Sequence, residues 1–372
     1  TSLDPRHSTE AITNSFSFMI YEGLTHLEPN GEVSLALAEK ITISSDQKEY
    51  LFTLRPSYWS NGDPVTAYDF EDSWKQVLSP LFNSSAAELL YPIKNAENLK
   101  KNKCSVNKLG VKALNKHTLK VELEYPTPHF LHLTAYPTYF PVSKKGGTAN
   151  LFSNQAKMIT NGPFKLVSWK NKHEIHLEKN PYFWAEKDVK IKQIHIINIS
   201  DEVTSLYLFE KNKLDWVGGY LSPLPLNALE HLKKFKLLKT HQTFGATLCF
   251  FNVTKHPLNN LNIRKALSYA IDPTLFIDGF TQLPINFLTP ESHIDRLENK
   301  QELAQKYFEL GLQELGILKK DFPILVYSHI SHEIQRNVAM ILQNQWKKVL
   351  DLHIELETNE PKTFFSKLLN GK

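Results

Sequence analysis

The sequence predicts an α/β protein with at least two lobes. Three observations support this fold class. The first two thirds of the chain consist mainly of short strand-like segments separated by turn residues, whereas the last third alternates strand and helix patterns. The length of 372 residues also exceeds that of a typical single domain. Two such different secondary-structure patterns in one chain indicate that its parts fold as separate lobes.

Two β-hairpins are predicted in the first half. Residues 39–56 alternate apolar and polar side chains on both sides of a Ser-Ser-Asp-Gln turn. Residues 110–128 repeat this pattern, with a turn at Asn115-Lys116 and prolines that end the second strand. Further along, the isoleucine-rich segment 191–200 is typical of a buried strand.

The last third is predicted to contain a strand–helix–strand unit. Residues 259–272 form a helical stripe behind an asparagine cap. A strand at 321–330, a helix at 332–350 and a strand at 352–359 then follow with short connections. Such a βαβ unit pairs its two strands in parallel.

Composition excludes several classes of protein. The net charge is only +4, from 43 basic and 39 acidic residues, and the basic runs are short, so we expect no nucleic-acid partner. No apolar run approaches the roughly 18 residues that span a membrane. The chain opens with TSLDP rather than a signal peptide, so we expect that any export signal or lipid-bearing cysteine has been removed. Cys104 and Cys249 are compatible with one disulfide or with two unpaired buried thiols.

A search for catalytic groups finds no convincing constellation. There is no glycine-rich phosphate loop and no G-x-S-x-G motif. His329, His332 and Glu333 suggest a metal helix, but Arg336 occupies the position of its second histidine, so these residues are interpreted as a polar helix start. Cys249 lies in an apolar strand pattern, where a thiol behaves as a small hydrophobic group. We therefore expect no enzyme activity, no metal and no cofactor.

Residues 54–80 resemble the signature of the oligopeptide- and dipeptide-binding proteins, which are the extracellular solute-binding components of bacterial ABC importers. The positions that fit that signature are Leu54, Arg55, Trp59 to Gly62, Pro64 to Ala67, Asp69, Phe70, Ser73 and Trp74. Seven further stretches agree with the family in the expected order: 1–5, 20–39, 109–130, 158–184, 202–217, 247–272 and 345–365. The resemblance thus covers nearly the whole chain.

In that family the stretch that corresponds to residues 58–80 has a structural role. Asn61-Gly62 supplies the turn, Pro64 stiffens it, and the aromatic side chains fasten the following helix to the sheet. We therefore interpret Trp59 and Trp74 as core residues rather than ligand contacts.

The resemblance implies a two-lobed periplasmic-binding-protein-like fold with a hinge and an extra, mainly β subdomain. Lobe I would comprise 1–34 and 153–245, with the β-rich subdomain at 35–152, and lobe II would comprise 246–372 with the crossing near Gln242–Asn252. The family members bind a short peptide between the lobes and deliver it to the membrane permease subunits. We expect a monomer that is exported to the periplasm or to the extracellular face of the cell membrane, free or lipid-anchored.

The chain also departs from the family pattern. Family members continue past residue 372 into a portion that carries an aspartate for the α-amino group of the peptide, and they have a strand before TSLDP. Segment 278–296 looks shorter than the usual loop. We expect that the C-terminal part of lobe II is missing from this chain.

Seven residues are carried over from the family as ligand-binding candidates. Glu22, Leu24, Tyr91, Gly218, Gly219, Tyr220 and Phe250 match cleft positions. A helix end or core contact is the alternative for the first two, and a plain turn is the alternative for the glycines. Phe250 would make a side-chain pocket apolar unless it packs in the core.

Three classes of function remain open at this point. The first is a receptor for short peptides. The second is the same fold with another ligand, such as glutathione, a cell-wall peptide, or a nickel or haem chelate. The third is a hydrolase with Cys249 as nucleophile, which would require a nearby activating histidine that the sequence does not indicate.

Overall fold

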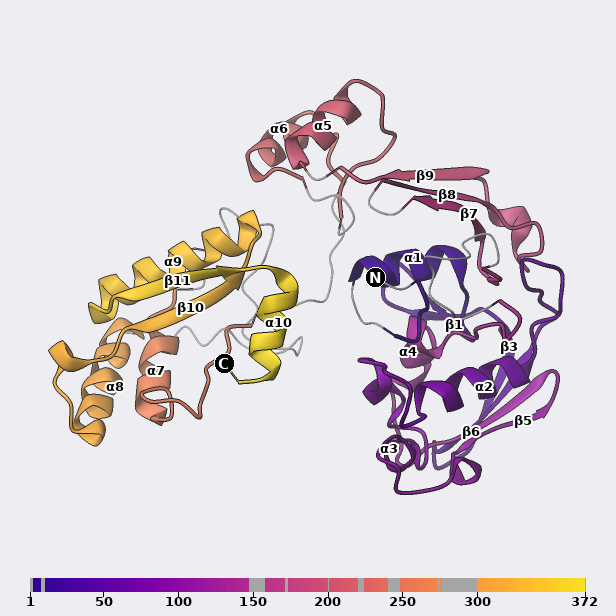
Figure 1. Ribbon diagram of the computed structural model, residues 1–372, viewed down its shortest axis with the longest axis horizontal. Helices are drawn as coiled ribbons and strands as arrows, with labels where there is room; N and C mark the ends of the chain where they lie inside the picture. The colour runs from indigo at the N-terminus through magenta and orange to yellow at the C-terminus, as the bar shows by residue number, and fades with distance from the viewer. Residues whose placement is uncertain are drawn as a thin grey trace. The chain divides into compact units, whose positions relative to one another are not determined.

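The computed structural model divides into two compact units, residues 1–225 and 226–372, and each is described by itself (Figure 1). The residues that the structure describes are 3–7, 11–146, 158–170, 173–199, 201–219, 224–239, 248–272, 275 and 300–371. Among them, no helix is long and apolar enough to cross a membrane. Tyr220, residues 242–247 and the segment 278–296 lie outside the described residues.

The first unit contains a four-stranded antiparallel sheet in the order β3-β4-β6-β5. Both predicted hairpins are confirmed, and they lie next to each other because β4 pairs with β6. The strands are β3 (Ala38–Ile43), β4 (Glu49–Leu54), β5 (Val111–Asn115) and β6 (Thr118–Glu122). A separate antiparallel pair joins β1 (Thr25–Leu27) to β2 (Val33–Leu35).

A second antiparallel sheet in this unit has the order β7-β8-β9. Its strands are β7 (Phe164–Lys170), β8 (Glu174–Lys179) and β9 (Gln193–Ile197). The predicted strand at 191–200 is confirmed as β9, but its predicted burial was wrong, because β9 is an edge strand and Ile191 and Ile197 are 56% and 52% exposed. Only Ile194 and Ile196 pack against the core, so the strand is half-buried.

Helices and short 3₁₀ turns connect these sheets. The α-helices are α1 (Ala11–Ile20), α2 (Ala67–Val77), α3 (Ala96–Lys100), α4 (Phe130–Thr134) and α5 (Glu202–Glu210). The 3₁₀ turns are η1 (Ala87–Leu90), η2 (Val106–Lys108), η3 (Pro137–Tyr139) and η5 (Glu186–Asp188).

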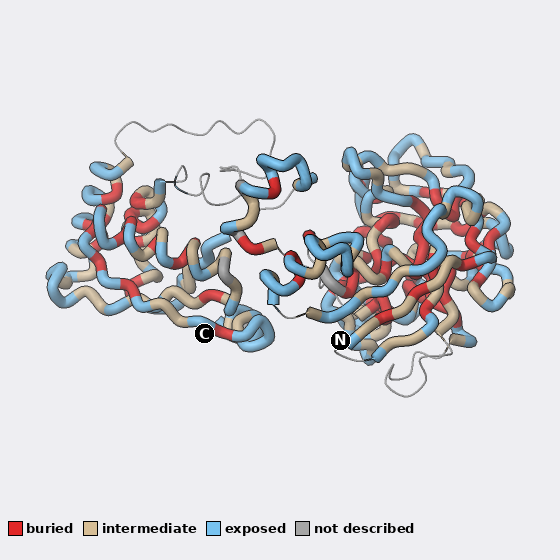
Figure 2. Tube along the Cα trace, turned by 90° about the horizontal axis from the view of Figure 1, so that it is seen from above, coloured by how far each residue is buried: buried red, intermediate tan, exposed pale blue. Residues whose placement is uncertain are grey.

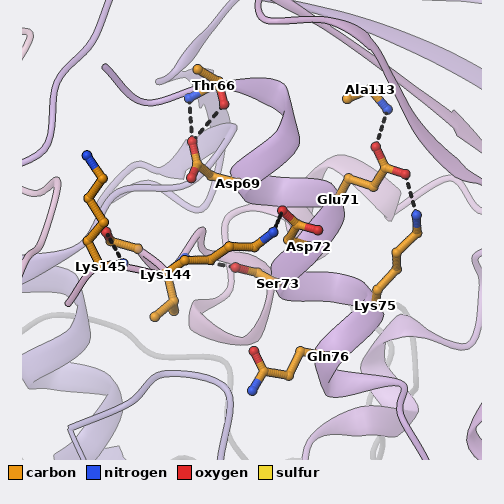
Figure 3. Close-up of polar contacts among 12 residues, drawn as sticks. Thr66, Asp69, Glu71, Asp72, Ser73, Lys75, Gln76, Ala113, Lys144 and Lys145 are labelled. Atoms are coloured by element: carbon orange, nitrogen blue, oxygen red, sulfur yellow. Dashed lines mark hydrogen bonds and ion pairs between the residues drawn. The ribbon is translucent and has the colours of Figure 1, made fainter. Parts of the chain in front are cut away.

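Helix α2 is fixed at its start and along its length by polar contacts (Figure 3). At the start, an Asp69 carboxylate oxygen accepts hydrogen bonds from the backbone N–H of Thr66 at 2.7 Å and from its hydroxyl at 2.8 Å. Such bonds restrain the first turn of a helix. Glu71 pairs with Lys75 on the same helix and also accepts a bond from Ala113 N of β5 at 2.8 Å, which ties the helix to the sheet.

The aromatic residues around α2 divide into core and surface. Trp59 and Trp74 are 2% and 0% exposed, so their interpretation as core residues is confirmed. The Trp74 indole N–H donates to Tyr139 O at 2.8 Å. Gly62 has a φ of +87°, as the turn requires. Tyr68 is 46% exposed and does not fasten the helix to the sheet.

One hydrophobic cluster runs through the interior of the first unit, and its buried residues can be followed in Figure 2. It joins Ile20 and Leu24 to Phe52 and Phe70, and to Leu177 of β8. The segment 35–152 therefore shares its core with the segments on either side of it.

The second unit contains the predicted βαβ arrangement. Strands β10 (Leu325–Ile330) and β11 (Ile354–Asn359) pair in parallel, with α9 (Glu333–Leu350) as the connection (Figure 1). The capped helix α7 (Leu261–Tyr269) is also confirmed, since the Asn260 side chain accepts from the N–H groups of residues 262 and 263. The other elements are η6 (Leu226–Ala228), α6 (Leu229–Lys234), α8 (Lys300–Leu315), η8 (Lys319–Asp321) and α10 (Pro361–Leu369).

The core of the second unit centres on α7, α8 and α9. Ile263 and Leu267 of α7 are almost fully buried and pack with Phe308 of α8 and Trp346 of α9. The Trp346 indole N–H donates to Leu267 O at 2.9 Å, which repeats the tryptophan-to-carbonyl bond of the first unit.

The two cysteines are both free. Cys249 is an exposed residue, which contradicts the alternative of two buried cysteines. The predicted strand around it stays a prediction, because the residues just before 248 lie outside the described part of the chain. Cys104 is half-buried.

Candidate functional site

Glu22 occupies a short connection between α1 and β1, where its backbone is fixed from a distant part of the chain. Its N–H donates to Asn161 Oδ1 at 3.2 Å, and its carbonyl accepts from Asn161 Nδ2 at 3.0 Å. Glu22 and Asn161 are 7% and 2% exposed. A buried amide that satisfies both backbone groups of one residue holds that residue in a single position.

The two segments around Glu22 and Asn161 approach so closely that glycine is required. Gly162 N donates to Ile20 O at 2.9 Å. A Cβ atom added to Gly162 would lie 2.5 Å from backbone atoms of Ile20 and Tyr21. Asn180 Nδ2 donates to the carbonyl of Gly162 at 2.9 Å and extends the network toward β8. The backbone around Glu22 is therefore pre-organised by packing as well as by hydrogen bonds.

Among the described residues, His26 pairs with the Glu22 carboxylate, and its Nδ1 lies 3.5 Å from Oε1. The hydrogen bond with Glu22 raises the pKa of His26 above its ordinary value, which favours the imidazolium. The His26 side chain is half-exposed, whereas the Glu22 side chain is 10% exposed. The sequence analysis missed His26 and Asn161. The separation of four residues was the only available signal for His26, and no local pattern indicated Asn161.

Leu24 lies in the core of the first unit and is 0% exposed. Its side chain is therefore a core contact, which was the alternative interpretation. Tyr91 follows η1 and is half-buried, and burial raises the pKa of its hydroxyl. It lines a shallow pocket of about 190 Å³ with Glu97, Glu124 and Tyr125.

Gly218 and Gly219 both have backbone angles that favour glycine. Their φ values are +127° and +68°. A Cβ atom added to Gly218 would have no described atom within 4 Å, whereas one on Gly219 would lie 3.6 Å from the ring of Trp216. Trp216 itself is 61% exposed. A turn with bare backbone beside an exposed indole is a surface that a ligand main chain can approach.

Phe250 belongs to the second unit and is 63% exposed. The alternative interpretation, that Phe250 packs in the core, was therefore wrong. Leu248 is 60% exposed, so the segment 248–250 presents an apolar surface. The other described candidates, Glu22, Leu24, Tyr91, Gly218 and Gly219, belong to the first unit.

Little in the described residues resembles a catalytic or metal centre. They contain no group of three or more His, Cys, Asp or Glu side chains that could hold a metal ion. Although the residue as a whole is exposed, nearby protein atoms desolvate the Cys249 sulfur and raise the pKa of its thiol to about 11, which opposes formation of a nucleophilic thiolate. His329 is a buried residue of β10 and not part of the helix start that the sequence predicted, with Nδ1 2.9 Å from the carbonyl of its neighbour Ile330 and Nε2 3.2 Å from the Thr358 hydroxyl of β11. It is thus a structural residue.

Comparison with known proteins identifies the family of the chain. Residues 32–372 match the family described as bacterial extracellular solute-binding proteins, family 5 middle. The chain belongs to this family. Its fold is accordingly the two-lobed fold of the family 5 solute-binding proteins.

Individual members of family 5 are similar over the whole chain. The oligopeptide-binding protein OppA of Bacillus subtilis is 37% identical over 383 residues, which cover 99% of this chain and 70% of that protein. A solved periplasmic oligopeptide-binding protein of Borrelia burgdorferi has a TM-score of 0.84 at 27% identity. Haemophilus influenzae OppA, solved in complex with RPPGFSPFR, has a TM-score of 0.81 at 26% identity. The chain is covered completely in both structural comparisons and spans 75% of each of the solved chains.

Proposed function

We propose that this protein is the solute-binding receptor of a bacterial ABC importer and that it captures short peptides for delivery to the membrane permease subunits. The observation that carries the proposal is the family match over residues 32–372, together with relatives named for oligopeptide binding. A peptide main chain is bound by backbone donors and acceptors, and its varied side chains are accepted by hydrated pockets.

The local geometry supports specific roles for three sites. The Glu22 carboxylate, held by its fixed backbone, accepts N–H donors of the peptide in exchange for His26. The Gly218-Gly219 turn presents backbone groups without side chains. Phe250 offers an apolar contact from the second unit. Tyr220 remains a proposed contact from the sequence.

The finer description of the protein is also a proposal. The division into lobe I (1–34 and 153–245), a β-rich subdomain (35–152) and lobe II (246–372) follows the family pattern. The protein acts as an exported monomer at the outer side of the cytoplasmic membrane, and it hydrolyses none of the peptides that it binds. Turnover of a peptide panel that is abolished by Cys249→Ala would contradict this last statement.

Mass spectrometry of ligands that co-purify with the protein tests the proposal. The protein is purified without added peptide, denatured gently, and the released small molecules are identified. The expected result is a mixture of short peptides with varied sequences. A single non-peptide species, such as glutathione or a nickel or haem chelate, would keep the family but overturn the proposed ligand class.

A further inference from the structure

Two histidine side chains stack against each other on the second sheet of the first unit. His176 of β8 and His195 of β9 are directly opposite in the antiparallel register. Their ring centroids are 3.9 Å apart and their planes differ by 32°. His195 is exposed, and His176 is half-buried. Among the described residues, this is the one contact between two imidazole rings.

The pair lies on the face of the sheet that is turned away from the core. Neighbouring positions of a strand point to opposite faces. Ile175 and Leu177, which flank His176 in β8, are 9% and 1% exposed and belong to the core cluster. His176 and His195 therefore occupy the opposite face, together with Glu174 and Glu178 of β8.

We propose that His176 and His195 form a binding site for a divalent transition-metal ion, with Ni²⁺, Cu²⁺ and Zn²⁺ as the matching class. Imidazole suits these ions. Two nitrogen atoms bound to one Zn²⁺ at 2.0–2.1 Å in tetrahedral geometry are about 3.3 Å apart. The lone pair of an imidazole nitrogen lies in the plane of its ring, so the two rings must turn out of their present contact before both can bind one ion. His195 is exposed and opposite His176 in the register, so its side chain can make most of this rotation.

An unsatisfied atom supports the same site. His176 Nε2 is buried and has no hydrogen-bond partner within the described part of the chain. A buried polar atom without a partner costs free energy, and a metal bond would satisfy it. Because His195 is exposed, its ring can move aside and admit the ion to that nitrogen.

The charged groups around the pair are compatible with a cation. On the same face, Glu174 pairs with Lys170 of β7, and Glu178 pairs with Lys165 of β7 at 2.8 Å. Glu174 and Glu178 share the face of the histidine pair, where these lysines partly offset their negative charge, and water would complete the coordination of an ion.

The sequence alone could not indicate this site. The two histidines are far apart in the chain, without any of the short spacings typical of metal motifs, and only the register of β8 with β9 brings them together. A site with two protein ligands also agrees with the lack of any larger ligand group among the described residues.

Calorimetric titration with NiCl₂ tests the proposal. The protein is prepared without a histidine tag, stripped with EDTA and titrated at neutral pH in a buffer that does not chelate metal. We expect saturable binding of one equivalent. Either His176→Gln or His195→Gln should weaken it by at least about tenfold, because each removes one of two ligands. Glu174→Gln should weaken it less. The control is His117→Gln, an exposed histidine in the β5–β6 hairpin, which should leave binding unchanged.

Two outcomes would overturn the site. One is the lack of binding at about 1 mM Ni²⁺, a concentration that corresponds to about −4 kcal/mol. The other is binding that survives both single substitutions. Cu²⁺ spectroscopy gives a second readout, since the wild type should show coordination by two imidazole nitrogens and each variant by one. Circular dichroism identifies any variant that fails to fold. The result does not depend on whether the protein binds peptides.

Discussion

The side chain of Asn161 makes two hydrogen bonds with the main chain of Glu22, one at 3.2 Å to its N–H and one at 3.0 Å to its carbonyl. These residues are 139 positions apart in the chain. The close contact of Gly162 with Ile20 and Tyr21 lies beside them. This arrangement means that the position of the Glu22 carboxylate is set by a remote segment rather than by the helix that precedes it.

We expect Asn161→Ala to destabilise the protein and to weaken ligand binding. The substitution leaves the buried N–H and carbonyl of Glu22 without their partner, at a cost of about 1–3 kcal/mol for each group. Thermal unfolding measures the loss of stability. Calorimetric titration with a peptide that the wild type binds measures the loss of affinity.

Asn30→Ala is the matched control, because Asn30 is an exposed residue whose side chain bonds only locally to Glu32. It should change both quantities little. If Asn161→Ala binds peptide as tightly as the wild type, the Glu22 backbone does not position a ligand contact.

Each unit has a buried tryptophan whose indole N–H donates to a backbone carbonyl, and the two can be compared. Trp74 donates to Tyr139 O, and Trp346 donates to Leu267 O. Replacing either with phenylalanine removes the bond and leaves a small cavity, so we expect a loss of about 1–3 kcal/mol. Hydrogen exchange followed by mass spectrometry should show faster exchange in the first unit for Trp74→Phe and in the second unit for Trp346→Phe. Equal loss of protection in both units would show that they do not unfold separately.

Glu357 of β11 gives a pH-dependent contribution to the stability of the second unit. Hydrogen bonds from Lys367 at 2.6 Å, Ser328 at 2.7 Å and Asn359 at 3.1 Å lower the pKa of its carboxyl to about 2, from an ordinary value of 4.5. The folded state thus holds its proton less tightly than the unfolded state. The stabilisation is complete above pH 4.5 and is lost as the pH falls toward 2.

The experiment compares the wild type with Glu357→Gln. Because the side chain is partly exposed, the contribution is about 1 kcal/mol or less. The variant should be less stable than the wild type at pH 7, and the difference should shrink between pH 4.5 and pH 3. A difference that stays constant over this range would mean that the carboxylate is not stabilised by these bonds.

Local patterns predicted the elements whose contacts are close in sequence. The two hairpins, the Asn260 cap of α7 and the β10–α9–β11 unit all follow from periodicity and turn residues, and the structure confirms them. Predictions that depended on a distant partner failed. The isoleucines of 191–200 indicated burial, but nothing in their spacing showed that β9 would lie at a sheet edge.

The candidate site shows the same division. The family resemblance supplied Glu22, but the residue that fixes it, Asn161, lies in a loop whose partner cannot be identified without the fold. From the sequence, Leu24 and Phe250 could each be either a ligand contact or a core residue. In the structure Leu24 is 0% exposed and Phe250 is 63% exposed. Side-chain type indicates what a residue can do, whereas exposure depends on neighbours from other parts of the chain.

Selectivity for peptide side chains follows if Phe250 and Tyr220 contact the ligand. Burying an apolar side chain against this surface is worth about 1.5–3 kcal/mol, or about a tenfold to hundredfold gain in affinity. A lysine side chain would lose hydration against this surface and would find no carboxylate unless Glu22 or Glu360 reached it. Tripeptides that differ only in leucine or lysine at one position should therefore bind with different affinities, and Phe250→Asp should reduce the difference. Equal affinities for the two peptides, or a preference for lysine that persists at high salt, would contradict this prediction.

Calorimetric titration of the ligand-free protein tests the central claim most directly. The protein is unfolded, dialysed to remove bound molecules, refolded and titrated in turn with a dipeptide, a tripeptide, a pentapeptide, glutathione, and nickel and haem chelates. We predict saturable binding with one site for at least one peptide of two to five residues, and weaker or no binding of the other ligands. Tight binding of a non-peptide ligand, with no heat from any peptide in the series, would contradict the claim that this protein is a peptide receptor.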